Sequence, residues 1–173
     1  MTGRTVWLTG LPSAGKSTIA QGVARLLRAD GTPVEVLDGD EIRRHLTPDL
    51  GFGRADREEN VRRIGYVAVL LARNGITVLV PVIAPYAAGR DKIRARHAEQ
   101  GISFLEVYVA TPVSVCASRD VKGLYARQKS GDLTGLTGVD APYEPPARPE
   151  LRVPAHRQPV QASIRAVYEL LST

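Results

Sequence analysis

Cysteine, aromatic residues and long apolar runs are all scarce in this chain. Its 173 residues include one cysteine and only 5% aromatic residues. A single cysteine excludes an internal disulfide and fits a reducing compartment, so we expect a cytoplasmic protein. Because Cys116 stands among apolar residues, we expect its thiol to be buried and unreactive. No apolar run reaches the length of a membrane span, and we expect neither a membrane partner nor a signal peptide.

Nucleic acid is also a poor candidate partner, although the chain is basic. Its net charge is +5 and its pI is about 9.7, and a basic protein can bind either nucleic acid or small polyanions. The lysines and arginines are dispersed, and no stripe of alternating basic and aromatic residues is present. Single-stranded nucleic acid is held on such aromatic platforms. The sequence therefore favours anionic small-molecule substrates held by several arginines.

A phosphate-binding loop is the most specific motif in the chain. Residues 10–18 read GLPSAGKST and fit the pattern G-x-x-x-x-G-K-[ST]. Residues 5–9 before it are typical of a buried strand, and residues 17–28 after it carry apolar residues at helical spacing. A chance glycine-rich turn would not require these flanking elements. The sequence therefore predicts that ATP is bound by Gly10, Ser13, Ala14, Gly15, Lys16, Ser17 and Thr18.

The chemistry of this loop gives separate roles to its residues. Glycines allow successive backbone N–H groups to point at phosphate oxygens, and the N-terminus of the following helix attracts negative charge. Lys16 is expected to reach the β- and γ-phosphates, and the Ser17 hydroxyl is expected to ligate Mg²⁺. We therefore expect ATP and Mg²⁺ to be the cofactors.

Predicted strands and helices alternate along the chain. The hydrophobic pattern predicts further strands at 34–37, 76–82, 103–109 and 151–153, and further helices at 41–45, 56–74, 89–99, 112–119 and 160–171. Asp56, with Glu59 three residues later, is expected to cap the helix that it opens. This alternation predicts an α/β, P-loop NTPase-type three-layer fold, with helices on both faces of a central, mainly parallel sheet.

The region from 120 to 158 differs from the rest of the chain. It is rich in proline and glycine and has little periodicity, so we expect a mobile lid and long loops there. No internal repeat or linker divides the sequence. We therefore expect residues 1–173 to form a single kinase domain.

Two carboxylates, Asp38 and Asp40, follow the second predicted strand. The carboxyl ends of parallel strands share one edge of a sheet, so we expect both carboxylates near the phosphate loop. The strand predicted at 76–82 ends without an acid, where many phosphate-loop enzymes carry one. We therefore take Lys16, Asp38 and Asp40 as catalytic candidates, with one carboxylate directed at the metal and the other at the acceptor hydroxyl. The sequence does not decide which of the two carboxylates faces the metal and which faces the acceptor. It also leaves open the alternative that Asp38-Gly39-Asp40 only caps the next helix.

Six further segments are typical of one kinase family. They are LDGD at 37–40 with Arg43, DLGF at 49–52, DREENVRRIG at 56–65, Pro85-Tyr86, RDVKGLY at 119–125 and TGVDAPYE at 137–144. With these segments the chain resembles the adenylylsulfate (APS) kinase family over nearly its whole length. The resemblance implies an ATP-dependent phosphotransferase of sulfate assimilation that phosphorylates the 3′-hydroxyl of adenosine 5′-phosphosulfate (APS) to give PAPS. It also implies a homodimer.

The resemblance implies a set of substrate-binding residues. Arg43, Arg57 and Asn60 match positions that hold the sulfonucleotide, and guanidinium groups suit a phosphosulfate because they offer paired donors. Phe52 matches a ring that stacks on the substrate adenine. The full set is Asp40, Arg43, Phe52, Arg57, Asn60, Ile83, Lys122 and Leu136.

A basic lid is implied for residues 119–129. Lys122 matches a residue that contacts the substrate or its phosphates, and Arg119 matches one beside the ATP adenine. Closure of such a lid would exclude water and bring positive charge to the transferred phosphoryl group. From the spacing alone, a solvated run of charges is an equally good interpretation.

Three residues depart from the family's pattern. Ala84 replaces a serine that has been assigned as a phosphoenzyme residue, so a covalent route through this position is impossible, whereas a direct in-line transfer from ATP remains open. Ala87 replaces an arginine near the substrate, and Leu136 replaces an aromatic residue, which leaves an aliphatic second wall for the adenine. A family-related kinase acting on a different small-molecule hydroxyl is therefore a second hypothesis. A nucleotide-binding regulatory protein without turnover is a third, and it conflicts with the intact set Lys16, Ser17, Asp38 and Asp40.

Overall fold

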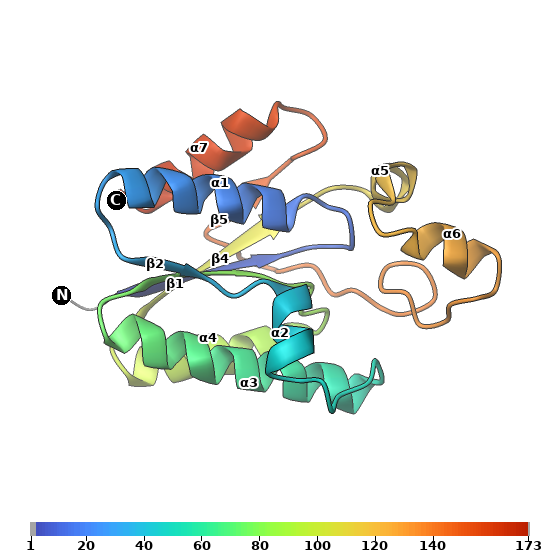
Figure 1. Ribbon diagram of the computed structural model, residues 1–173, viewed down its shortest axis with the longest axis horizontal. Helices are drawn as coiled ribbons and strands as arrows, with labels where there is room; N and C mark the ends of the chain where they lie inside the picture. The colour runs from blue at the N-terminus through green and yellow to red at the C-terminus, as the bar shows by residue number, and fades with distance from the viewer. Residues whose placement is uncertain (1–2, 173) are drawn as a thin grey trace.

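A five-stranded parallel sheet lies at the centre of the protein (Figure 1). The computed structural model describes residues 3–172. The strand order is β2-β3-β1-β4-β5, and every neighbouring pair is parallel. The strands are β1 (Arg4–Thr9), β2 (Val34–Val36), β3 (Thr77–Pro81), β4 (Ser103–Val109) and β5 (Leu151–Val153).

The central strand β1 sends its side chains alternately to the two faces of the sheet, as strand geometry requires. Val6 and Leu8 join the hydrophobic cluster on one face and Trp7 joins the cluster on the other, and all three are fully buried. Because both faces are covered, every residue of β1 from Thr5 to Thr9 is buried, which is typical of a central strand in a parallel sheet.

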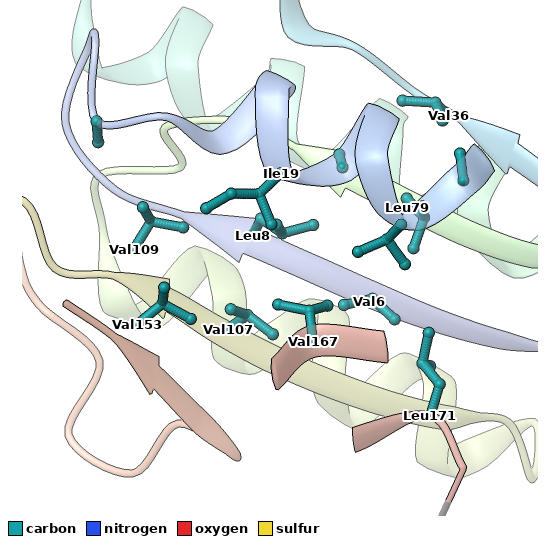
Figure 2. Close-up of a cluster of buried hydrophobic side chains, with 14 of the residues drawn as sticks. Val6, Leu8, Ile19, Val36, Leu79, Val107, Val109, Val153, Val167 and Leu171 are labelled. Atoms are coloured by element: carbon teal, nitrogen blue, oxygen red, sulfur yellow. The ribbon is translucent and has the colours of Figure 1, made fainter. Parts of the chain in front are cut away.

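Helices cover both faces of the sheet (Figure 1). α1 (Lys16–Ala29) and α7 (Val160–Leu170) lie on one face, and α3 (Arg54–Arg73) and α4 (Ala87–Glu99) lie on the other. Figure 2 shows the first cluster, in which Ile19 of α1 and Val167 of α7 pack on Leu8 and its neighbours. The second cluster joins Trp7 to apolar residues of α3 and α4. The predicted three-layer α/β fold is confirmed.

Three short helices lie near the carboxyl ends of the strands. They are α2 (Gly39–His45), α5 (Val113–Arg119) and α6 (Leu124–Lys129). Figure 1 shows α5 and α6 beyond the strand ends, with the chain from 131 to 150 returning from them to β5. The predicted strand at 151–153 is present, whereas α6 was not predicted. A six-residue helix is too short for its periodicity to show in the sequence.

The predicted N-terminal cap of α3 is wrong. The helix begins at Arg54, its N-cap is Gly53, and no side chain caps it. Asp56 lies inside the first turn, where its carboxylate accepts a 3.1 Å hydrogen bond from the N–H of Gly51 instead. Glu59 forms ion pairs along the helix and does not reach back to the cap.

Within residues 3–172, none of the helices combines the length and the apolar character that crossing a bilayer requires.

Candidate active site

The phosphate-binding loop between β1 and α1 has the conformation that its sequence requires. Gly10 and Gly15 have φ values of 156° and 107°, and Ser13 has a φ of 63°. Lys16 is buried, and its Nζ donates to the carbonyl oxygens of Gly10 at 2.9 Å and Leu11 at 2.7 Å. Burial lowers the pKa of Lys16 from 10.5 to about 8. The loop therefore holds an ammonium group that carbonyl dipoles only partly stabilise, which favours an anionic ligand.

Asp38 links the phosphate loop to α2. The hydroxyl of Ser17, in the first turn of α1, donates a 2.6 Å hydrogen bond to Asp38 Oδ2. The other carboxylate oxygen of Asp38 accepts from the N–H of Asp40 at 3.1 Å and so caps α2. Asp38 is thus a helix cap and a neighbour of Ser17 at once. A hydroxyl and a carboxylate are oxygen ligands of the kind that Mg²⁺ prefers, so these residues fit a magnesium ion held with substrate phosphates and water. No group of three or more His, Cys, Asp or Glu residues that could enclose a metal occurs within 3–172.

The predicted lid lies directly against the phosphate loop. Lys122 forms an ion pair with Asp40, a contact that the sequence did not indicate. The N–H of Val121 donates to Ser13 Oγ at 3.3 Å, and the hydroxyl of Tyr125 donates to the carbonyl oxygen of Pro12 at 2.9 Å. Two hydrogen bonds therefore anchor the lid to the phosphate loop, one at Val121 and one at Tyr125 in α6.

Arg119, predicted beside the ATP adenine, lies at the C-terminal end of α5. Its guanidinium donates to the carbonyl oxygen of Ala14 in the phosphate loop at 3.4 Å. Cys116, one turn earlier, is buried as predicted. Burial raises the pKa of its thiol.

Arg43 of α2 and Phe52 of the loop before α3 contact each other. Arg43 donates to the carbonyl oxygens of Leu50 at 3.2 Å and Gly51 at 2.7 Å, and its guanidinium lies 4.7 Å from the centre of the Phe52 ring. Phe52 is 72% exposed. A flat base could stack on a ring this exposed.

Arg57 and Asn60, predicted to hold the substrate, instead bond to protein atoms in this structure. Arg57 donates to the carbonyl oxygens of Phe52 at 2.7 Å and Gly135 at 2.5 Å, and also to the hydroxyl of Thr137. The buried side chain of Asn60 accepts a 2.7 Å hydrogen bond from the hydroxyl of Thr47. Arg57 therefore joins the loop before α3 to the returning chain at 135–137, and both residues shape the site.

The side chain of Leu136, a predicted substrate contact, is buried in this structure. It is only 5% exposed and belongs to the hydrophobic cluster of α1 and α7. Its burial follows from the fold of residues 135–141, where the carboxylate of Asp140 accepts from the N–H groups of Gly135 and Leu136 and turns the side chain inward.

Ile83 follows β3 at the same edge, and its carbonyl oxygen accepts from Thr9 Oγ1 at 2.5 Å. Two charged residues near it, Arg90 and Glu144, were not singled out from the sequence. The sequence contained a signal for Arg90, because its spacing with Ile93 and His97 places it on the buried face of α4.

Comparisons with known proteins agree on one family. The chain matches the adenylylsulphate kinase family over residues 2–154. It is 50% identical to an adenylyl-sulfate kinase of Synechococcus sp. (strain JA-2-3B'a(2-13)), covering 99% of this chain and 95% of that protein. It is 49% identical to an adenylyl-sulfate kinase of Myxococcus xanthus, over 98% of this chain and 91% of the relative. The structure of the Mycobacterium tuberculosis APS kinase in complex with AMPPNP and APS has a TM-score of 0.95 and 46% identity, and covers 99% of both chains.

Proposed function

The chain belongs to the adenylylsulfate kinase family and is an ATP-dependent phosphotransferase, and we propose which of its residues transfer the γ-phosphate of ATP to the 3′-hydroxyl of APS. The observation that carries this assignment is the gathering of Lys16, Ser17, Asp38 and Asp40 at one edge of the sheet.

The donor half of the site is built on the phosphate loop. We assign the loop amides and Lys16 to the β- and γ-phosphates of ATP, and Arg119 to the adenine side. Ser17 and Asp38 would hold Mg²⁺, either directly or through water. Mg²⁺ supplies charge neutralisation on the transferred phosphate when it is bound.

Asp40 is our candidate for the residue that orients the acceptor hydroxyl. As the 3′-oxygen attacks the γ-phosphorus, Asp40 accepts the hydroxyl proton, the bond between the γ-phosphorus and the bridging oxygen breaks, and ADP leaves. Lys122 must release Asp40 before this step, and its ammonium can then pair with phosphate oxygens. Ala84 offers no hydroxyl for a covalent intermediate at this position, which supports a direct in-line transfer.

The acceptor would lie between α2, the start of α3 and the segment after β3. Phe52 is free to stack on its adenine, and Arg43 lies beside that ring. Arg57 and Asn60 would hold in place the segments that surround the acceptor, and the backbone near Leu136 would be one of these segments.

We further propose that residues 1–173 work as a single kinase domain, with residues 120–158 as the lid and loop region. We also propose a cytoplasmic homodimer. Higher assembly occurs in a relative, since a structure at TM-score 0.72 and 33% identity is a hexameric APS kinase of Thiobacillus denitrificans, of which this chain covers 29%.

A coupled assay of ADP release from MgATP tests this function, with APS, AMP or no acceptor present. ADP release that requires APS, with PAPS as product, is the expected result. Slow ADP release that is indifferent to APS would contradict it. That result would support the second candidate, a kinase for another small-molecule hydroxyl, which Ala84, Ala87 and the buried Leu136 favour.

A further inference from the structure

Residues 83–87, which we name the acceptor segment, connect β3 to α4 at the edge that holds the phosphate loop. The segment contains Ile83, a proposed acceptor contact. Ala84 has a φ of 43°, in the left-handed region that residues with a Cβ rarely adopt. Such a conformation persists only where the surrounding contacts hold it in place. The residues that hold this segment therefore control the geometry of the acceptor site.

Glu144 contacts the acceptor segment through both its backbone and its side chain. Its N–H donates to the carbonyl oxygen of Pro85 at 2.8 Å, and its Oε2 accepts from the N–H of Ala87 at 2.7 Å. Ala87 is the first residue of α4, and the N-cap residue Tyr86 provides no side-chain hydrogen bond. Glu144 thus caps α4 from a distant part of the chain and places a carboxylate at the positive end of the helix.

Arg90 holds the same segment from the inside. It is only 2% exposed, and each of its three side-chain nitrogens has an acceptor. Nη1 donates to the carbonyl oxygen of Ala84 at 2.6 Å, Nη2 to the carbonyl oxygen of Glu144 at 2.7 Å, and Nε to Glu106 at 2.7 Å. A buried guanidinium is tolerated only when it is fully paired, so Arg90 has little freedom to move.

The acceptor segment is also connected to the donor side. Thr9, the last residue of β1 before the phosphate loop, donates through Oγ1 to Ile83 and lies 3.0 Å from the hydroxyl of Tyr143. Tyr143 precedes Glu144 in the chain. A continuous set of hydrogen bonds therefore runs from the end of β1 through residues 143–144 to the acceptor segment.

We propose that Arg90 and Glu144 are positioning residues for the phosphoryl acceptor. They act through the backbone of residues 84–87 and fix the acceptor segment relative to the phosphate loop, without contacting the substrate themselves. The inference rests on the proposed function, because APS is the acceptor with which it is tested.

The deciding variant is Glu144→Ala, compared with Glu144→Gln and Glu150→Ala. An amide oxygen can still accept from the N–H of Ala87, so Glu144→Gln should retain activity. Glu150 is a matched control, because it lies in the same returning chain and bonds to Arg94 and to the N–H of Glu106 but makes no hydrogen bond to the acceptor segment.

Glu144→Ala should raise the KM for APS about tenfold, a change of the size expected when the hydrogen bond that fixes the acceptor segment is lost. The KM for ATP and the affinity for AMPPNP should change less than about twofold, and Glu144→Gln and Glu150→Ala should resemble the wild type within about threefold. Arg90→Lys should raise the KM for APS as well, since lysine cannot reach all three acceptors. Glu144→Ala decides the test if Arg90→Lys fails to fold.

The outcomes separate this inference from the proposed function. If the wild type phosphorylates APS and Glu144→Ala has an unchanged KM for APS, the inference is wrong while the function stands. An equal loss in the KM for ATP and for APS would also overturn it, because that pattern indicates general destabilisation. If the wild type neither binds nor phosphorylates APS, the proposed function fails and the acceptor role fails with it.

Discussion

The hydroxyl of Ser17 and the carboxylate of Asp38 lie 2.6 Å apart, joined by a hydrogen bond across the strand-end edge. One residue belongs to the first turn of α1 and the other caps α2. Their separation is set by β1 and β2, which flank β3 in the sheet. The pair therefore brings a metal-ligating hydroxyl and a carboxylate together on a rigid frame.

The first prediction concerns the metal. Chelation of divalent cations should abolish ADP release, and Asp38→Asn should raise the Mg²⁺ concentration for half-maximal activity by ~10- to 100-fold, since partners of metal ligands have effects of this size. Titration of activity with Mg²⁺ measures it. Glu41→Gln, at an exposed carboxylate on the same helix, is the control. An Mg²⁺ titration of Asp38→Asn that matches the wild type would remove Asp38 from the metal site.

The second prediction concerns the ionisation of Lys16. In the free protein its pKa is about 8, so most of the Lys16 side chains are neutral at pH 8.5. Bound triphosphate favours the ammonium form and raises this pKa, so ATP binding at pH 8.5 should take up as much as about one proton per site. Calorimetry in two buffers of different ionisation enthalpy measures the uptake. At pH 7 the lysine is already protonated and this uptake should disappear; equal uptake at both values would argue against the low pKa.

The third prediction separates the function of Lys122 from its part in stability. The ion pair between Lys122 and Asp40 is exposed, so Lys122→Met should change the free energy of unfolding by less than about 1 kcal/mol. Because Lys122 is assigned to the transferred phosphate, kcat/KM for APS should fall at least about tenfold. Lys129→Met removes an exposed lysine of α6 and serves as the control. Normal kcat/KM in Lys122→Met would show that the lid lysine has no part in transfer.

Local motifs explain most of what the sequence predicted about this site. The phosphate loop has a fixed backbone shape, and the parallel topology places Asp38 and Asp40 beside it, so both followed from short stretches of sequence. The inward turn of Leu136 and the contacts of Arg57 depend on how the chain at 131–145 folds over the edge, and that segment has no periodicity. The start of α3 was misplaced because Asp56 has a competing partner, the N–H of Gly51.

The fourth prediction concerns stability at acid pH. His97 is fully buried between the carbonyl oxygen of Ile93 and the hydroxyl of Thr5, and burial lowers its pKa from 6.5. Below pH 6.5 the unfolded chain therefore binds a proton that the folded protein does not, and stability falls as pH falls. This loss should be absent in His97→Gln, and it is at most about 1.4 kcal/mol per pH unit for one group.

Urea unfolding at pH 7, 6 and 5 measures this effect. The exposed His45 provides the control variant His45→Gln, which should follow the wild type. If the wild type and His97→Gln lose stability in parallel, His97 is not the group responsible.

The central position of β1 has a consequence for how the protein is made. β1 precedes the other four strands of the sheet in the chain, yet its neighbours are residues 77–81 and 103–109, and within residues 3–172 β2 pairs with β3 alone. β1 and β2 are not neighbours in the sheet, so neither strand has a partner until β3 has been synthesised. The apolar residues of β1 must therefore remain without a partner during much of translation. The phosphate loop, which depends on β1 for its shape, therefore cannot take up its folded shape before β3 has been synthesised.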